Sequence, residues 1–162
     1  MKLLLYNIII KFMKIMVETM KIIAKNKKAY FNYELLEKLE VGIVLTGSEI
    51  KSIRLGNVSL QDSYVTFSNN EAYIINMNIN TYKFTTSYIL DPLRKRKLLL
   101  NAREIKKIQQ EQKQKNLTVV PTMIYLNSKS RAKLEIALAR GKKNYDKRET
   151  IKNRDAVRKI KK

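Results

Sequence analysis

The chain has 162 residues, and its 34 Lys and Arg against 14 Asp and Glu give it a formal net charge of +20. It contains no cysteine and no histidine. This excludes disulfide scaffolds, thiolate metal sites and catalysis by thiols or imidazoles, so we predict neither a metal nor a cofactor. The length allows one domain of moderate size with tails. A charge excess of this size over one small domain is typical of a nucleic-acid-binding protein.

The first twenty residues are apolar but interrupted. Asn7, Lys11 and Lys14 break the apolar stretch, and no small-residue cleavage site follows it. The segment therefore fits neither a secretory signal nor a membrane span. We expect residues 1–20 to be an extension outside the domain or a start site called too early, with Met13, Met16 or Met20 as the true start. Because no other long apolar run follows, we predict a cytoplasmic protein without a membrane partner.

Two β-hairpins are predicted in the middle of the chain. Residues 63–67 alternate polar and apolar side chains before Asn69 and Asn70, which suit a tight turn into residues 72–77. Residues 117–126 and 133–138 form a second pair around a connection at 127–130. Pro121 lies inside the first of these runs, which indicates an edge position or a bulge because proline cannot donate to a β-ladder. A short apolar run at 41–45 predicts a further strand.

Two helices are predicted between these strands. Residues 48–55 place Ile50 and Ile53 near one face, begin at a residue suited to capping and stop at Gly56. Residues 101–115 are good helix formers, with Asn101 as cap and Glu104 three positions later. Residues 33–40 are ambiguous, because their composition favours a helix and the run that follows favours a strand.

Two basic clusters are the main functional signal. From Arg140 to Lys162 the chain has eleven Lys or Arg and three Asp or Glu, more net charge than a core could enclose. Residues 94–97 are four consecutive cations followed by three leucines, so the leucines are expected to anchor the segment while the cations remain outside. Tyrosines in the strand regions could stack on unpaired bases, but the pattern singles out none of them. We predict binding of a polyanion, with a merely basic surface as the alternative.

Four blocks of sequence, in order, resemble the SmpB family, the small bacterial SsrA-binding proteins that are partners of transfer-messenger RNA. The blocks are residues 40–54, 62–65, 91–100 and 141–154, and the similarity covers residues 23–162. The resemblance implies a small, mainly β, oligonucleotide-binding (OB-like) barrel over 21–140, with two or three flanking helices. It also implies that the basic tail, 141–162, is disordered until it binds the ribosome and becomes helical there.

The resemblance implies a binding function in which the protein catalyses no reaction. Family members bind the tRNA-like domain of transfer-messenger RNA and, with elongation factor Tu, bring its alanyl-charged form to 70S ribosomes stalled on messages without a stop codon. The tail enters the empty messenger channel. By analogy we expect a monomer that is not an enzyme. The residues implied to contact the RNA are Glu40, Lys51, Arg54, Arg94, Arg96, Lys97, Leu99, Leu100 and Asn101. Those implied to contact the ribosome are Lys142, Lys143, Tyr145, Asp146, Lys147, Arg148, Lys152 and Arg154.

Two other classes of protein stay open from the sequence. A general single-stranded RNA-binding or ribosomal protein would share the charge and the barrel, but has no reason to reproduce four ordered blocks. A metal-dependent nuclease would need Glu49, Asp62 and Asp91 to converge around a magnesium ion. One departure from the family also stands out: Ile89 and Leu90 replace a polar pair that is common before Asp91, which puts an RNA contact from that position in doubt.

Overall fold

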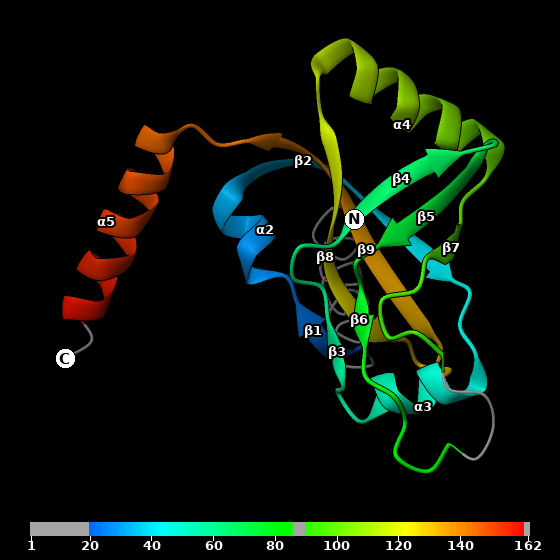
Figure 1. The fold of residues 1–162 in the computed structure, drawn as a ribbon. Coiled ribbons are helices and arrows are strands. Elements are labelled where there is room, and N and C mark those ends of the chain that lie inside the picture. The colour runs from blue at the N-terminus through cyan, green and yellow to red at the C-terminus, as the bar shows by residue number, and fades with distance from the viewer. Residues whose placement is uncertain (1–19, 86–89, 161–162) are drawn as a thin grey trace, which may run out of the picture.

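The computed structural model describes residues 20–85 and 90–160, so all but the last residue of the predicted extension at 1–20 lies outside the described residues. Their backbone forms a curved antiparallel sheet of seven strands in the order β1-β8-β9-β2-β7-β5-β4, with a separate pair of short strands, β3 and β6 (Figure 1). The strands are β1 Lys21–Lys25, β2 Tyr33–Ile43, β3 Val58–Ser59, β4 Tyr64–Ser68, β5 Glu71–Ile75, β6 Asn78–Ile79, β7 Arg96–Leu99, β8 Thr118–Leu126 and β9 Ala132–Gly141. The helices are α2 Lys27–Asn32, α3 Gly47–Arg54, α4 Ala102–Lys115 and α5 Asn144–Ile160.

The sheet curls until β4, at one end of the strand order, comes close to β8, near the other end. One core fills the curl, built from inward-facing side chains of both hairpins and of β2, α3 and β7. Its fully buried members include Ile53, Ile74, Leu98, Ile124 and Leu134. This confirms the predicted mainly β fold with an OB-like barrel and flanking helices.

Both predicted hairpins are present. Asn69 and Asn70 adopt left-handed backbone angles, with φ of 50° and 56°, between β4 and β5. Such angles match the twist of a two-residue hairpin turn, and asparagine tolerates them. In the second hairpin, β8 pairs with β1 on one side and β9 on the other, and a register shift follows Pro121. The bulge is therefore confirmed, whereas Pro121 does not lie on an edge strand; the pairing with β1 simply ends before it, at Met123.

The ambiguous segment 33–40 is strand. Tyr33–Ile43 pairs with β9 along most of its length, so the sheet overrides a composition that favours a helix. Both predicted helices form, but α3 is capped by Thr46 and not by Ser48. The backbone N–H of Thr46 donates to Oε2 of Glu49 at 2.8 Å, which completes a capping box. The six-residue helix α2, capped by Asn26, was not predicted from the sequence.

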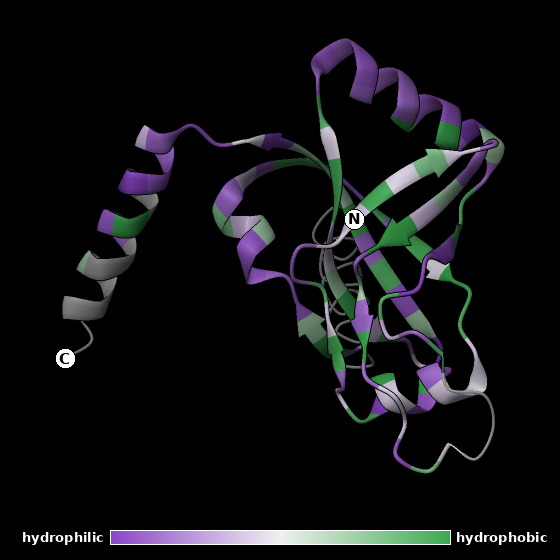
Figure 2. Cartoon of the chain, in the orientation of Figure 1, coloured by the Kyte–Doolittle hydropathy of each residue, from purple (hydrophilic) through white to green (hydrophobic). Residues whose placement is uncertain are grey.

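The basic tail carries helix α5, which stands away from the barrel beyond an extended connection (Figure 1). The tail joins the body near α2, where the N–H of Lys142 donates to the carbonyl of Asn32 at 2.9 Å. Figure 2 shows α4 and the first turns of α5 as mostly hydrophilic, whereas apolar residues gather in the strands. A helix with so little apolar surface gains little from packing on the barrel. Disorder of this tail in the free protein stays a prediction.

Candidate RNA interface

Glu40 lies at the centre of a patch on the outer face of the sheet. Its carboxylate contacts Lys133 of β9 and Tyr125 of β8, and Leu99 of β7 lies opposite Gly42, two residues along β2; Glu40 and these three residues form what we call the Glu40 patch. Gly42 pairs with Leu99 on one side and Lys133 on the other, and Lys133 pairs with Tyr125. A Cβ on Gly42 would lie 3.0 Å from Cδ1 of Leu99, so glycine lets this leucine lie over β2. Leu99 remains 58% exposed, although it is apolar.

Two groups hold the carboxylate of Glu40. Tyr125 donates its hydroxyl proton to Oε2, and Nζ of Lys133 lies 3.2 Å from Oε1. The Tyr125 hydrogen bond lowers the pKa of Glu40; burial opposes this and Lys133 reinforces it. The side chain is nevertheless 53% exposed. The patch therefore presents an ionised, oriented acceptor beside a cation and an exposed leucine, which can accept hydrogen bonds from base amino and imino groups.

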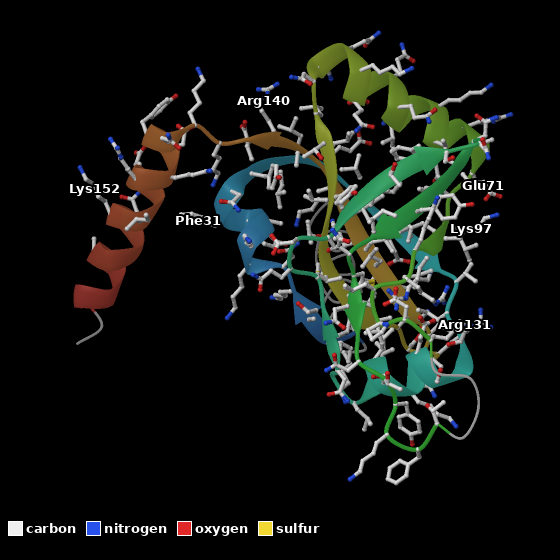
Figure 3. The ribbon with its side chains drawn as sticks, viewed as in Figure 1. Phe31, Glu71, Lys97, Arg131, Arg140 and Lys152 are labelled. Atoms are coloured by element: carbon white, nitrogen blue, oxygen red, sulfur yellow. The ribbon has the colours of Figure 1, made fainter. Side chains whose placement is uncertain are left out.

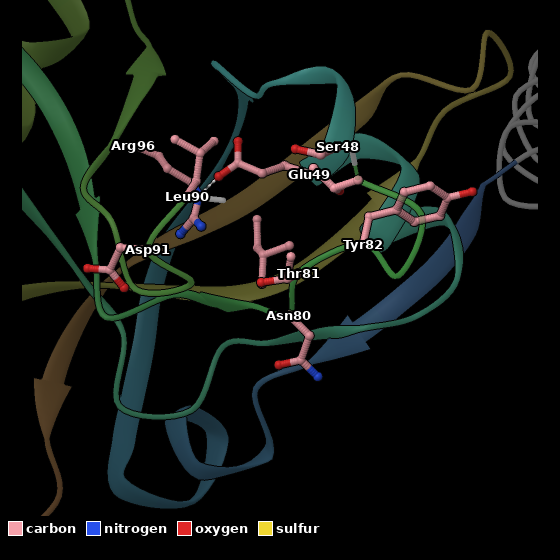
Figure 4. Close-up of a pocket in the computed structure, with 10 residues that line it drawn as sticks. Ser48, Glu49, Asn80, Thr81, Tyr82, Leu90, Asp91 and Arg96 are labelled. Atoms are coloured by element: carbon pink, nitrogen blue, oxygen red, sulfur yellow. Dashed lines mark hydrogen bonds and ion pairs between the residues drawn. The ribbon is translucent and has the colours of Figure 1, made fainter. Parts of the chain in front are cut away.

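Glu49, Arg94 and Arg96 form a hydrogen-bonded cluster at the base of the 91–96 segment, and Figure 4 shows the bond between Glu49 and Arg96. Arg94 donates to Glu49 twice, from Nε at 2.7 Å and from Nη2 at 2.6 Å. Arg96 donates from Nε to the same carboxylate at 2.8 Å and from its other nitrogens to the carbonyls of Met77, Pro92 and Arg94. The adjoining cavity of about 20 Å³ has room for a water molecule, not a base.

The position of Arg96 contradicts the expectation that all four cations of residues 94–97 remain outside. Arg96 does not stand outside: its side chain is 0% exposed and all three of its nitrogens donate to protein oxygens. Burial alone would raise the pKa of Glu49, but the bonds from Arg94, the Thr46 N–H and Arg96 outweigh it and lower that pKa to about 2. Burial lowers the pKa of Arg96, and Glu49 opposes that effect. Arg96 thus holds the segment in place and has no surface to offer a phosphate.

The other predicted RNA-contacting cations are on the surface. Lys97 is exposed on β7 and forms an ion pair with Glu71 on β5. Lys51 and Arg54 are exposed on α3, and Arg54 donates from Nη2 to the carbonyl of Ser130 at 3.2 Å. Arg94 keeps part of its side chain exposed beyond Glu49. These positions allow phosphate contacts, which remain a prediction for each residue.

The leucines and asparagine that follow β7 divide between core and surface. Leu98 is buried, Leu99 is exposed, and Leu100 is partly buried against the core. Asn101 is exposed and caps α4, its backbone N–H donating to Glu104 at 2.8 Å. The predicted division between anchoring leucines and outward residues is therefore right for Leu98 and Lys97.

The ribosome-directed residues lie in the connection before α5 or on the helix itself. Lys142 reaches back to α2, and the N–H of Lys143 donates to Asp146 at 3.0 Å, which closes the first turn of the helix. Tyr145, Arg148 and Lys152 are exposed, and Lys147 is half-buried. The side chain of Arg154 lies outside the described part of the chain.

One member of each set can be compared directly: Lys97 of the RNA set and Lys152 of the ribosome set lie on different sides of the molecule (Figure 3). In Figure 3, Lys97, Glu71 and Arg131 lie on the side opposite α5, which carries Lys152. Sequence reasoning missed the residues that orient Glu40, because Tyr125 was only one of several tyrosines that could stack on bases. Tyr125 is 3% exposed and bonded to Glu40, so it is not a stacking residue. The alternation of polar and apolar residues in β9, which points Lys133 outward, is the one sequence signal that could have indicated Lys133 as a partner of Glu40.

The carboxylates that a nuclease would need do not converge. Glu49 forms ion pairs with Arg94 and Arg96, and Asp62 forms an ion pair with Lys28 at 2.6 Å. Within residues 20–85 and 90–160, no group of three or more acidic side chains is placed to hold a metal ion. Nor is any helix in that part of the chain both long and apolar enough to cross a membrane. The structure thus gives Glu49 a scaffold role in place of a catalytic one.

Comparison with known proteins identifies the family of the chain. The family model described as SmpB protein matches residues 23–162. The chain belongs to the SmpB family. An SsrA-binding protein of Malacoplasma penetrans is 56% identical over 143 residues, covering 88% of this chain and 97% of that protein. Another, from Mycoplasma mycoides, is 52% identical over 140 residues, covering 85% and 93%.

A solved structure of an SmpB family member in complex agrees with the fold. It is described as "tmRNA-SmpB: a journey to the center of the bacterial ribosome", and its matching chain is 42% identical, with a TM-score of 0.63. The match covers 75% of this chain and 85% of that one. The resemblance drawn from the four blocks is therefore confirmed, and the family to which the chain belongs consists of RNA-binding proteins.

Proposed function

We propose that this protein binds the tRNA-like domain of transfer-messenger RNA and delivers it to stalled ribosomes for trans-translation. The observation that carries the proposal is that the family match runs from residue 23 to 162 and so includes barrel and tail together. The Glu40 patch and the exposed cations of α3 and β7 supply a surface suited to RNA. The tail supplies a second, separate basic element.

We assign the two elements different RNAs. The body contacts transfer-messenger RNA through the Glu40 patch, Asn101 and the surface cations Lys51, Arg54 and Lys97. The tail contacts ribosomal RNA of the empty messenger channel, with Tyr145 able to stack on a base and Lys142, Lys143, Lys147, Arg148, Lys152 and Arg154 able to meet phosphates. The delivery complex includes elongation factor Tu, and the protein acts as a cytoplasmic monomer without catalysing a reaction.

A gel-shift competition tests the proposal. Labelled tRNA-like fragment is bound to the full chain and competed with unlabelled fragment or with an unrelated RNA hairpin of equal length. We expect the fragment to compete far better at the same salt concentration, because the Glu40 patch reads shape and base edges in addition to charge. Equal competition would instead support a general RNA-binding protein.

A further inference from the structure

A loop beside α3 carries two neighbouring aromatic rings on the surface. Tyr82 and Phe84 meet edge to face, with centroids 5.7 Å apart and planes at 63°. Phe84 is 72% exposed, which is unusual for a phenylalanine without a function. The loop is anchored, because Ser52 donates its hydroxyl to the carbonyl of Asn80 at 2.5 Å and the N–H of Thr85 donates to the carbonyl of Tyr82 at 3.0 Å.

The rings are surrounded by positive charge. Nζ of Lys51 lies 5.6 Å from the centroid of the Tyr82 ring, within range of a cation–π interaction. The bond from Arg54 to Ser130 brings the turn between β8 and β9 against α3 and adds its cations to the same end of the barrel. The exposed cations of these segments are Lys51, Arg54, Lys83, Lys129 and Arg131.

These cations lack acidic partners among the residues that the structure describes, since none of their side chains forms an ion pair there. Glu49, the acidic residue of α3, is already bound to Arg94 and Arg96. The partly buried Tyr73 differs in this respect, because its cluster contains Glu71, which accepts from the Tyr73 hydroxyl and pairs with Lys97. The Tyr82–Phe84 loop thus combines free ring surface with uncompensated positive charge.

We propose that Tyr82 and Phe84 form a stacking platform for an unpaired nucleobase of the bound RNA, whose flanking phosphates meet Lys51 and Lys83. The inference rests on the proposed function, and it names a contact that lies outside the Glu40 patch. An aromatic pair offers a π-face to any base, and adjacent cations hold the backbone on either side. A protein partner fits less well, because the five exposed cations outnumber the carboxylates of Glu49 and Asp91, which line the pocket beside Tyr82, and the apolar surface is limited to a few side chains.

Substitution of Phe84 tests the platform through affinity for the tRNA-like fragment. We expect Phe84→Ala and Phe84→Leu to weaken binding about 5- to 150-fold, whereas Phe84→Tyr keeps it near the original value. Because no charge changes, the dependence of affinity on salt concentration should keep its slope. Tyr64→Ala is the matched control, since Tyr64 is also exposed but lies on β4. Unchanged affinity of Phe84→Ala, the result expected if the loop binds a protein, would overturn the proposal.

A fluorescent substitution reports the stacking itself. The chain has no tryptophan, so Phe84→Trp introduces a single indole. We expect its emission to fall when the tRNA-like fragment binds and to stay constant with a blunt RNA duplex that has no unpaired base. Constant emission under saturating fragment would overturn the platform while leaving the proposed function standing. If the unsubstituted protein fails to prefer the fragment, it is the proposed function that fails.

Discussion

Single residues of this protein combine roles that are usually separate. Glu49 completes the capping box of α3 with the N–H of Thr46 and accepts three bonds from Arg94 and Arg96. One carboxylate thereby ties a helix start to the strand that carries Lys97 and Leu99. A buried ion pair gives little net stability compared with apolar packing, but breaking one leaves an uncompensated charge. The stability of the fold therefore depends on Glu49 more than the position of this residue on a surface helix suggests.

Replacing Glu49 by glutamine should destabilise the fold strongly. The change leaves the guanidinium of Arg96 buried without a counter-charge, and we expect a loss of about 3–5 kcal/mol in the free energy of unfolding. Urea denaturation followed by circular dichroism measures it. Glu71→Gln is the matched control, because it breaks the exposed pair with Lys97 and should leave the unfolding midpoint nearly unchanged. Equal effects of the two changes would contradict the scaffold role of Glu49.

Stability should also fall in acid through the same residue. Folding lowers the pKa of Glu49 from 4.5 to about 2, so its contribution is complete above pH 4.5 and is lost as the pH falls toward 2. The shift corresponds to about 3 kcal/mol. Urea midpoints measured between pH 6 and pH 2 should decline less in Glu49→Gln than in the unsubstituted protein. Parallel declines would mean that other carboxylates carry the acid sensitivity.

Tyr125 should influence RNA binding without touching the RNA. In Tyr125→Phe the carboxylate of Glu40 loses its donor, so its pKa rises toward the usual value and its orientation is freed. We expect about 2- to 10-fold weaker binding of the tRNA-like fragment at neutral pH, equivalent to one hydrogen bond. The deficit should grow as the pH falls toward 5, because the variant's Glu40 protonates earlier. Filter binding measures the affinity of both proteins across this pH range. Parallel curves of affinity against pH would contradict the prediction.

At the scale of elements, pairing decides what composition leaves open. Tyr33–Ile43 is rich in Glu and Leu, yet its backbone pairs with β9 and, at its end, with β7. The same strand places Glu40 and Gly42 on one face, which is how the Glu40 patch forms. By contrast, α5 follows its composition: it is helical, hydrophilic and linked to the body through the connection near α2.

Removal of the tail should separate the two proposed roles. A chain ending at Arg140 keeps every strand except the last residue of β9 and retains the Glu40 patch. We expect its affinity for the tRNA-like fragment to stay within about 3-fold, because few of the body's contacts are lost. Tagging of peptides on stalled ribosomes should be abolished in a reconstituted translation assay. Normal tagging by the shortened chain would show that the tail assignment is wrong.

At the scale of the whole molecule, charge is distributed between two regions that lie apart. The formal charge of +20 includes the tail's cations and those of the barrel, and Figure 3 shows Lys152 of the tail on the side away from Lys97 and Arg131. Arg96 contributes to the total but is buried, so the count overstates what an RNA can reach. The affinity for the tRNA-like fragment should therefore depend on the exposed cations of the body and hardly at all on the cations of the tail.

Measured salt dependence should reflect this division. Lys51→Gln combined with Arg54→Gln should reduce the slope of log affinity against log salt by about 1.4 to 1.8, since each lost phosphate contact removes about 0.7 to 0.9. The double change Lys147→Gln and Arg148→Gln serves as the control and should leave the slope for the tRNA-like fragment unchanged. A changed slope in the tail variant with an unchanged slope in the α3 variant would indicate that the tail, and not the barrel, binds the fragment.

The sequence by itself determined the hairpins, helices α3 and α4 and the family, because turn asparagines, alternation, capping residues and ordered blocks are local signals. Only the tertiary structure decided which charged side chains are available. Arg96 and Lys97 are neighbours in sequence, but strand β7 turns one into the core and the other outward. Likewise, Glu40 acquires Tyr125 and Lys133 from strands more than eighty residues away, through pairing that no local pattern encodes. The physical reason is that burial and charge compensation depend on which strands meet, and that is settled by the packing of the whole barrel.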